Sequence, residues 1–208
     1  MGKRFDIIVA GAGMVGACCA LAMARHGYRV AIIEPSEMPV NELNGDGDYD
    51  LRVSAVSPAS QRLLSELGVW QALNSNRVCE YEKMFVWHEH GQASLEFDSA
   101  EMAQASLGAI AENRQIVHAL RLACERQANI EWFSPDHIVE LMENSEQTVS
   151  VQLSSHGELT SDLLIAADGR GSATRELAGL HSTGGDYRQR AIVANIDTEL
   201  PHLRTAWQ

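Results

Sequence analysis

The chain has 208 residues, 45% of them hydrophobic and 21% charged, so it can bury a sizeable core and suits one domain plus part of another. Its formal net charge of -12 repels phosphate backbones and anionic lipid surfaces, which argues against nucleic acid as a partner and against an electrostatic membrane anchor here. The start, Met1-Gly-Lys-Arg, leads into an apolar stretch that is too short for a signal peptide or membrane span, and we expect a cytoplasmic protein.

The first predicted elements are a strand, a glycine turn and a helix. An apolar strand over residues 5–10 precedes three glycines in the pattern Gly-x-Gly-x-x-Gly, and an apolar helix over residues 15–26 follows. In such a turn Gly11 permits the tight bend, Gly13 lets the backbone approach a pyrophosphate, and Gly16 lets the helix lie close to the sheet.

A second strand, over residues 29–34, ends in Glu34 at the right distance to accept hydrogen bonds from a ribose diol. The free N–H groups at the helix start, with the positive end of its dipole, attract phosphates. This unit predicts a bound dinucleotide, and FAD, NAD and NADP all stay open at this point.

Past Glu34, polar stretches alternate with periodic apolar ones. Pro35 stops the second strand, and the acidic residues 36–50 predict a loop. Ser57-Pro58 opens a helix, and alternating apolar residues farther on predict a β-hairpin that pairs residues 84–87 with 93–97. Apolar residues at helical spacing after Pro58 predict a core stripe: Leu63, Leu64, Leu67 and Trp70.

The second half of the chain returns to a helical pattern and then to extended ones. A helix is expected from near Asn113. An apolar strand over residues 163–167 runs into the turn Asp168-Gly-Arg-Gly-Ser172, which opens another helix. Further extended segments are expected at four places: residues 130–133, 138–142, 149–153 and 188–197.

The cysteines and histidines give weak signals. The cysteines form no C-x-x-C pair, so we interpret them as buried, reduced thiols. His88 and His90 would share one face of a strand, but no third ligand is evident nearby, and we expect no metal site. The cysteines are Cys18, Cys19, Cys79 and Cys124.

Two later features bear on ligand binding. Arg52 follows the acidic loop, and its fixed positive charge either reaches a pyrophosphate or ribityl chain or pairs with an acidic neighbour at the surface. Asp168 and Gly169 end a buried strand, where the carboxylate either contacts a ligand or caps the next helix. The local pattern leaves both alternatives open at each position.

Taken together, three segments resemble one family. They are the glycine turn ending in Glu34, Asp50-Leu-Arg52-Val-Ser-Ala-Val-Ser-Pro58, and Leu164-Ile-Ala-Ala-Asp168-Gly169-Arg170-Gly-Ser172 through Arg175. In this order and spacing they are similar to the FAD-dependent aromatic hydroxylases, the group of para-hydroxybenzoate hydroxylase, and within it to the ubiquinone-biosynthesis branch. The resemblance covers essentially the whole chain.

The resemblance implies which residues contact FAD. The glycine turn would meet the pyrophosphate and Glu34 the ribose of the adenosine half, while Arg52 and Arg114 would face the ribityl and linker region. The aspartyl-glycine corner would face both FAD and the passing nicotinamide nucleotide, with Arg175 a weaker candidate beside it. No catalytic residue is assigned. The cofactor-binding positions are Gly11, Ala12, Gly13, Gly16, Glu34, Arg52, Arg114, Asp168 and Gly169.

The resemblance also implies an α/β fold, with a Rossmann-like FAD-binding domain on a mostly parallel sheet and incomplete pieces of a β-sheet substrate domain. The FAD-binding domain would take residues 1–77 and 99–184, and the substrate domain residues 78–98 and 185–208. The family's third motif, Gly-Asp followed by small residues and His, does not occur after Gly171. We therefore expect a C-terminally incomplete chain that binds FAD weakly or not at all by itself and is inactive alone.

By the same resemblance, the intact protein would be a monooxygenase that uses FAD, NAD(P)H and molecular oxygen to hydroxylate a polyprenylated phenol in ubiquinone biosynthesis. Because that substrate resides in the membrane, the intact protein would attach peripherally. Other ubiquinone-biosynthesis proteins and a second copy of the chain are candidate partners. Two alternatives stay open: an NAD-linked dehydrogenase with the same first turn, and a non-catalytic dinucleotide-binding module.

Overall fold

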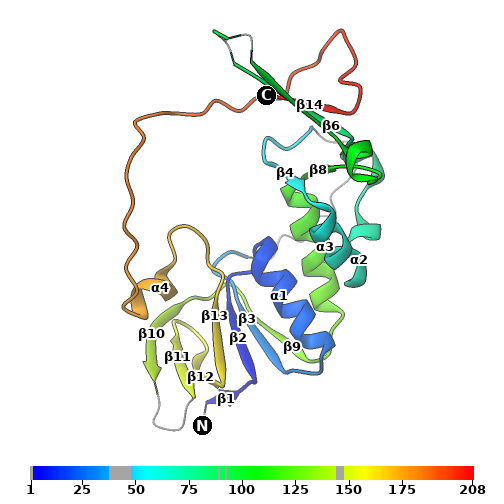
Figure 1. Ribbon diagram of the computed structural model, residues 1–208. Helices are drawn as coiled ribbons and strands as arrows, with labels where there is room; N and C mark the ends of the chain where they lie inside the picture. The colour runs from blue at the N-terminus through cyan, green and yellow to red at the C-terminus, as the bar shows by residue number, and fades with distance from the viewer. Residues whose placement is uncertain (1, 38–47, 89, 92, 144–147) are drawn as a thin grey trace. The chain divides into compact units, whose positions relative to one another are not determined.

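The structure is a computed structural model that describes residues 2–37, 48–88, 90–91, 93–143 and 148–208 (Figure 1). Two compact units make up the chain: residues 1–42 with 117–189, and residues 43–116 with 190–208. The loop predicted over residues 36–50 falls mostly outside the described residues. Its described ends belong to no helix or strand.

A four-stranded parallel sheet forms the centre of the first unit. All residues of its two middle strands are buried, as expected for strands covered on both faces. The parallel pairing confirms the mostly parallel sheet predicted from the sequence. The strands stand in the order β13 (Leu163–Ala166), β2 (Ile7–Ala10), β3 (Val30–Ile33) and β9 (Ile130–Phe133).

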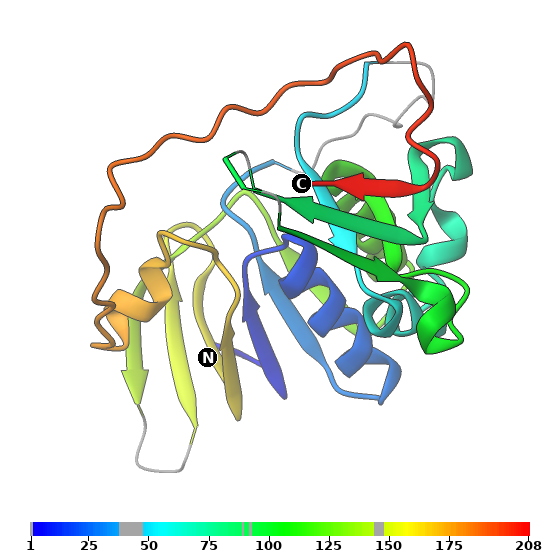
Figure 2. The ribbon, with the colours of Figure 1, turned by 45° about the horizontal axis from the view of Figure 1, so that its top comes forward.

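Helix α1 (Met14–Arg25) covers one face of this sheet, as Figure 2 shows. The later part of α3 (Asn113–Glu125), a helix that begins in the second unit, packs on α1. There the Sγ of Cys124 donates to the carbonyl oxygen of Ala17 over 3.3 Å. Small residues let α1 approach the strands closely, and its buried residues are Gly16, Ala17, Ala20, Leu21 and Ala24.

A second sheet covers the opposite face. Because side chains alternate along a strand, Ile8 and Ile33 point to that side, and each such buried side chain contributes about 1.5–3 kcal/mol. The rings of Phe5 and Phe133 meet edge to face in this core at 5.9 Å. The strands of the second sheet stand in the order β1 (Lys3–Arg4), β12 (Gly157–Ser161), β11 (Val149–Leu153) and β10 (Ile138–Glu143).

A buried carboxylate, that of Asp136, fastens the β11–β12 turn to the segment before β10. Asp136 is 2% exposed and accepts hydrogen bonds from the Oγ of Ser154 at 2.5 Å and from the Nδ1 of His156 at 2.6 Å. The backbone N–H groups of His137, Ser155 and His156 also donate to it. Burial alone would raise the pKa of Asp136, but these hydrogen bonds outweigh it and lower the pKa to about 2.

The second unit holds two three-stranded sheets. In one, β4 (Val53–Val56), β8 (Gly108–Glu112) and β5 (Val78–Tyr81) pair antiparallel in that order. In the other, the order is β14 (Thr205–Trp207), β6 (Lys83–Trp87) and β7 (Ser94–Asp98). The antiparallel pairing of β6 and β7, with Met84 opposite Phe97, confirms the predicted hairpin.

Helix α2 (Pro58–Glu66) begins where the sequence predicts. The Oγ of Ser57 accepts from the backbone N–H of Ser60 over 3.3 Å, and Pro58 occupies the first turn. The predicted core stripe is correct at Leu64 and Leu67, which are buried, and wrong at Leu63, which is 45% exposed. Neighbouring helical residues point about 100° apart, so Leu63 cannot face the same side as Leu64.

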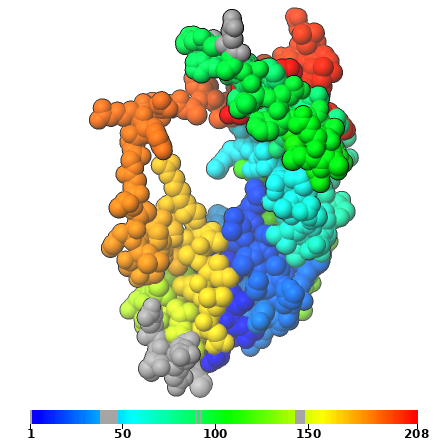
Figure 3. All heavy atoms as spheres, viewed as in Figure 1, coloured from blue at the N-terminus to red at the C-terminus, as the bar shows by residue number. Residues whose placement is uncertain are grey.

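The strand predicted over residues 188–197 is wrong. These residues form no strand, and no described strand pairs with them. Ile192 is 94% exposed and Ile196 79% exposed, and Figure 3 shows the segment after α4 (Ala173–Leu177) as a narrow file of atoms. A short apolar run becomes a strand only where neighbouring backbone satisfies its N–H and C=O groups.

Candidate dinucleotide site

The glycine turn joins β2 to α1 in the first unit. Gly11 has a φ of 97°, a left-handed value that favours glycine. A Cβ on Gly11 would lie 2.5 Å from the carbonyl oxygen of Ala167, so the turn touches the end of β13. The N–H of Gly11 donates to the carbonyl of Ile33 over 2.7 Å, which ties the turn to the end of β3.

The two other glycines of the motif differ in what surrounds them. A Cβ on Gly16 would lie 2.0 Å from the carbonyl oxygen of Gly11, so the first turn of α1 lies directly on the glycine turn. A Cβ on Gly13 would meet none of the described atoms within 4 Å. Gly13 is also the N-cap of α1 and supplies no side-chain cap. Open space therefore borders a helix N-terminus whose N–H groups and dipole attract anions.

Glu34 follows β3, and its carboxylate turns back to the glycine turn. Its Oε2 accepts from the backbone N–H of Ala12 over 2.7 Å, and its Oε1 accepts from the N–H and the Oγ of Ser36 at 3.2 and 2.5 Å. Burial alone would raise the pKa of Glu34, but the bonds from Ser36 and Ala12, with the charge of Arg121, lower it below its ordinary value. Glu34 is thus an ionised hydrogen-bond acceptor beside the turn.

The aspartyl-glycine corner follows β13. One oxygen of Asp168 accepts from the Oγ of Ser172 over 2.5 Å, and the other accepts from the N–H of Thr174 over 3.0 Å. Burial tends to raise the pKa of Asp168, and these bonds more than offset it and lower the pKa. The sequence left two roles for Asp168: the structure shows the helix-capping contacts, and contact with a ligand stays a prediction. Gly169 has a φ of 85°.

Arg52 lies in the second unit, just before β4, and is exposed. Its backbone is held at both ends, because its N–H donates to Asp50 over 3.1 Å and its carbonyl accepts from the N–H of Asn113 over 2.9 Å. Within the part of the chain that the structure describes, its guanidinium forms no ion pair. The surface pairing considered from the sequence is therefore not seen among those residues.

Arg114 also lies in the second unit, where it pairs with the buried carboxylate of Glu112. The Nε of Arg114 donates to Glu112 over 2.8 Å, and the Nη1 of Arg77 donates to it over 3.1 Å. The N–H of Asp50 donates to the same carboxylate over 3.0 Å. The side chain of Glu112 is 3% exposed and that of Arg114 39%, so two guanidinium groups share one buried negative charge.

The structure thus brings together the predicted residues of the first unit: the glycine turn, Glu34 beside it, and the Asp168 corner against Gly11. The Cα of Asp168 would lie 2.9 Å from a Cβ on Gly11. All of them stand at the carboxyl ends of parallel strands, where ligands of such sheets bind. Arg52 and Arg114 belong to the other unit, and their approach to the same ligand stays a prediction.

Among the largely buried charged groups that sequence reasoning missed, Arg121 and Glu112 contact predicted site residues. Arg121 contacts both Ala12 and Glu34. Glu112 pairs with Arg77 and Arg114. The signal for Arg121 was a charge directly beside Leu120, which lies on the buried face of α3. For Glu112 it was an acid at the end of an apolar strand. Neither sequence pattern identifies the distant residues with which Arg121 and Glu112 form ion pairs.

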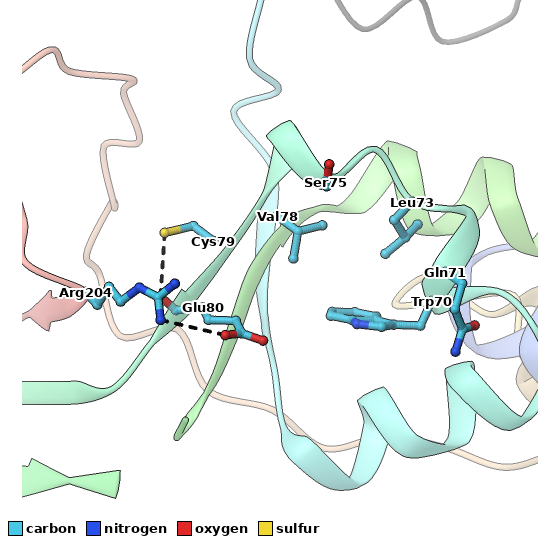
Figure 4. Close-up of a pocket in the computed structure, with 8 residues that line it drawn as sticks. All are labelled: Trp70, Gln71, Leu73, Ser75, Val78, Cys79, Glu80 and Arg204. Carbon is cyan, nitrogen blue, oxygen red and sulfur yellow. Dashed lines mark hydrogen bonds and ion pairs between the residues drawn. The ribbon is translucent and has the colours of Figure 1, made fainter. Parts of the chain in front are cut away.

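A separate pocket, of about 400 Å³, lies within the second unit (Figure 4). Trp70, Leu73 and Val78 form its apolar part, and Arg204 lies across from them with Glu80 at 3.9 Å. None of the predicted cofactor-binding residues lines this pocket.

The expected burial of the cysteines is correct at Cys124 and wrong at Cys79, which is exposed on β5. Cys18 and Cys19 are half-buried. Burial raises the pKa of Cys124 to about 12, so this thiol is protonated near neutral pH. His88 and His90 lie beyond the end of β6 rather than on a strand, with ring centroids 6.1 Å apart.

The first unit is therefore a dinucleotide-binding α/β fold, with an open helix N-terminus and an ionised acid at the carboxyl edge of its parallel sheet. The chain belongs to the family described as FAD binding domain, which it matches over residues 4–208. The fold and the family match confirm the resemblance to the FAD-dependent aromatic hydroxylases that the sequence motifs indicate.

Two of the curated relatives have names that refer to ubiquinol or to ubiquinone biosynthesis. The chain is 32% identical to 3-demethoxyubiquinol 3-hydroxylase of Escherichia coli K12, over 98% of this chain and 51% of that protein. It is 30% identical to the human mitochondrial ubiquinone biosynthesis monooxygenase COQ6, over 98% of this chain and 46% of that protein. The chain thus spans about half the length of the curated relatives it matches.

Solved structures share the fold. Pseudomonas aeruginosa PqsL in complex with 2-aminobenzoylacetate has a TM-score of 0.70 at 19% identity, over 89% of this chain and 48% of PqsL. The p-nitrophenol 4-monooxygenase PnpA of Pseudomonas putida DLL-E4 has a TM-score of 0.68 at 22% identity, over 86% of this chain and 44% of PnpA. At these identities the likeness concerns the fold alone.

Proposed function

We propose that this chain is the FAD-binding part of an aromatic-ring monooxygenase of ubiquinone biosynthesis. The observation that carries the proposal is the first-unit site: an uncapped helix N-terminus bordered by open space at Gly13, beside the ionised Glu34. These groups suit a pyrophosphate followed by a ribose. The family membership makes FAD the dinucleotide, and the names of the curated relatives indicate the pathway.

The proposed roles follow from these positions. N–H groups at the start of α1 would hold the pyrophosphate beside the turn at Ala12, and Glu34 would accept from the ribose of the adenosine half. Arg52 and Arg114 would supply positive charge to the ribityl and linker region, and the Asp168 corner would border the flavin. The corresponding domain division, residues 1–77 with 99–184 and residues 78–98 with 185–208, belongs to the same proposal.

When bound, FAD would supply the redox chemistry that links reduced nicotinamide and molecular oxygen to hydroxylation of the phenol ring. The residues of this chain bind and orient the cofactor, and none is assigned as an acid or base. The third family motif does not occur in this sequence, so we expect the 208 residues alone to bind FAD more weakly than the intact protein and to be inactive.

The proposed substrate is a polyprenylated phenol, because the motifs resemble those of 2-octaprenylphenol hydroxylase and because two relatives have names that refer to demethoxyubiquinol and to ubiquinone biosynthesis. Such a substrate resides in the bilayer, so the intact protein would work at a membrane surface with NAD(P)H as reductant. Among the described residues, no helix combines the length and apolarity needed to cross a membrane.

The test uses the intact protein that contains this chain, purified and supplied with NADH or NADPH, oxygen and either a prenylated or a soluble phenol. We expect bound yellow flavin, nicotinamide oxidation stimulated by the prenylated phenol, and a product one oxygen atom heavier by mass spectrometry. Activity on soluble phenols alone would overturn the substrate. A colourless protein that reduces NAD would indicate the NAD-linked dehydrogenase. A protein that neither oxidises nor reduces nicotinamide would indicate the non-catalytic binding module.

A further inference from the structure

Arg121 is a largely buried charge that none of the proposed roles uses. It lies on α3 in the first unit, and its side chain is 12% exposed. Its Nε donates to the carbonyl oxygen of Ala12 over 2.9 Å, and its Nη2 lies 3.6 Å from the Oε2 of Glu34. Removing a guanidinium from water is costly unless it is paired, so these contacts determine where the side chain lies.

The contacts of Arg121 close a ring around one residue of the glycine turn. Glu34 accepts from the N–H of Ala12 over 2.7 Å, Arg121 donates to the carbonyl of Ala12, and Arg121 pairs with Glu34. Both backbone polar groups of Ala12 are therefore held by charged side chains. Bonds of this kind are about twice as strong as neutral ones, so the ring fixes the turn and the acid as one unit.

One oxygen of Glu34 takes no part in the ring. Oε2 is taken by Ala12 and Arg121, whereas Oε1 accepts only from Ser36 among the contacts described. Ser36 is exposed, and its hydroxyl is 2.5 Å from Oε1. A ribose hydroxyl is the same kind of donor and takes the same lone pair when the Ser36 hydroxyl rotates away.

We propose that Arg121 is a positioning residue of the dinucleotide site, which holds Glu34 so that the Oε1 of Glu34 accepts a hydrogen bond from the ribose hydroxyl. The inference rests on the proposed function, because it presupposes that the site binds an adenosine diphosphate group. A guanidinium suits this task better than an ammonium, because its fork places one nitrogen on the Ala12 carbonyl and another toward the Glu34 carboxylate.

A purely structural arginine would stabilise α3 without affecting which ribose is preferred. The two roles are separated by comparing ADP with 2′-deoxy-ADP, since the second ligand keeps both phosphates and lacks the hydroxyl that Glu34 reads. Binding of each to the 208-residue chain is measured by calorimetry or amide NMR. The variants are R121M, R121K and the control R126M, which removes the same charge from an exposed position directly after α3.

We expect the unsubstituted chain and R126M to prefer ADP about tenfold, the value of one hydrogen bond to a charged group. In R121M the preference for ADP over 2′-deoxy-ADP should fall to about threefold or less, mainly because ADP binds more weakly. R121K should lie between, because an ammonium keeps the charge and loses the fork. In an E34Q background, R121M should change the preference no further, since both substitutions remove the same contact.

The result that overturns the inference is R121M binding both nucleotides more weakly while keeping the full preference for ADP. If R121M does not fold, an R121K chain that folds and keeps the full preference overturns it equally. An unsubstituted chain that binds ADP and 2′-deoxy-ADP alike overturns it too. If the 208-residue chain binds neither nucleotide, the same comparison is made with the intact protein freed of FAD. Failure of that apoprotein to bind ADP contradicts the proposed function itself, so the two failures are distinguishable.

Discussion

The glycine turn allows one substitution to be compared at two positions three residues apart, Gly16→Ala and Gly13→Ala. At Gly16 the new methyl would lie 2.0 Å from a backbone oxygen of Gly11, and backbone cannot turn aside as a flexible side chain can. Overpacking costs about 1–3 kcal/mol and this contact belongs at the upper end, while alanine regains about 1 kcal/mol over glycine inside a helix. We expect a net loss of about 2 kcal/mol in the free energy of unfolding.

At Gly13 the methyl meets none of the described atoms within 4 Å, and φ is -70°, which alanine adopts freely. The free energy of unfolding should fall by less than about 1 kcal/mol, the difference between glycine and alanine at an N-cap. The methyl occupies the space in which a pyrophosphate approaches the backbone, so ADP affinity should fall by about tenfold or more.

Urea unfolding followed by circular dichroism measures the stabilities, and calorimetry measures the affinities. The expected pattern is crossed: G16A is unstable, whereas G13A is stable and binds poorly. Equal stability of G16A and the unsubstituted chain would contradict the close packing of α1 on the turn. Undiminished nucleotide binding by G13A would contradict the location of the phosphate site.

Asp136→Asn should lower the free energy of unfolding by about 2–4 kcal/mol, because a carboxylate that accepts from several donors is replaced by an amide. The folded pKa of Asp136 lies below its ordinary 3.8, so its stabilisation is present above that pH and is lost as the pH falls through about 2. Unfolding monitored from neutral to acidic pH checks this. The prediction is refuted if the stability of D136N falls as steeply over that pH range as the stability of the unsubstituted chain does. Glu112→Gln should cost about 3 kcal/mol by leaving Arg77 and Arg114 without their buried partner, whereas Glu96→Gln, at an exposed pair, should cost under about 1 kcal/mol. Equal midpoints for the two glutamine variants in urea would show that the buried network contributes no more than a surface contact.

Local patterns predicted the first unit well because they carry their own physical cause. The turn around Gly11 needs a residue that tolerates positive φ, the buried strands on either side of α1 need continuous apolar residues, and α2 needs the cap that Ser57 supplies. Each requirement is met within a few neighbouring positions. The hairpin of β6 and β7 was readable for the same reason, since its alternation and its turn lie next to each other.

Features that depend on residues far apart in the sequence could not be predicted from local patterns. Residues 188–197 contain an apolar run that is typical of a strand, but the sequence does not say whether a neighbouring edge is present to pair with them. Cys79 is apolar enough for a core, yet β5 presents it outward. Arg121 and Glu34 are far apart in sequence, so their meeting over Ala12 follows only from the packing of α3 on α1.

Backbone amide NMR of the 208-residue chain during a titration with FAD tests the dinucleotide site most directly. The amides of Gly13, Arg52 and Gly169 should shift together along one binding curve, with a dissociation constant weaker than about 1 μM because the third family motif is missing. FAD that binds while these three amides stay unmoved, or that moves Arg52 along a different curve, would contradict a single shared site. Submicromolar affinity would contradict the need for the missing motif.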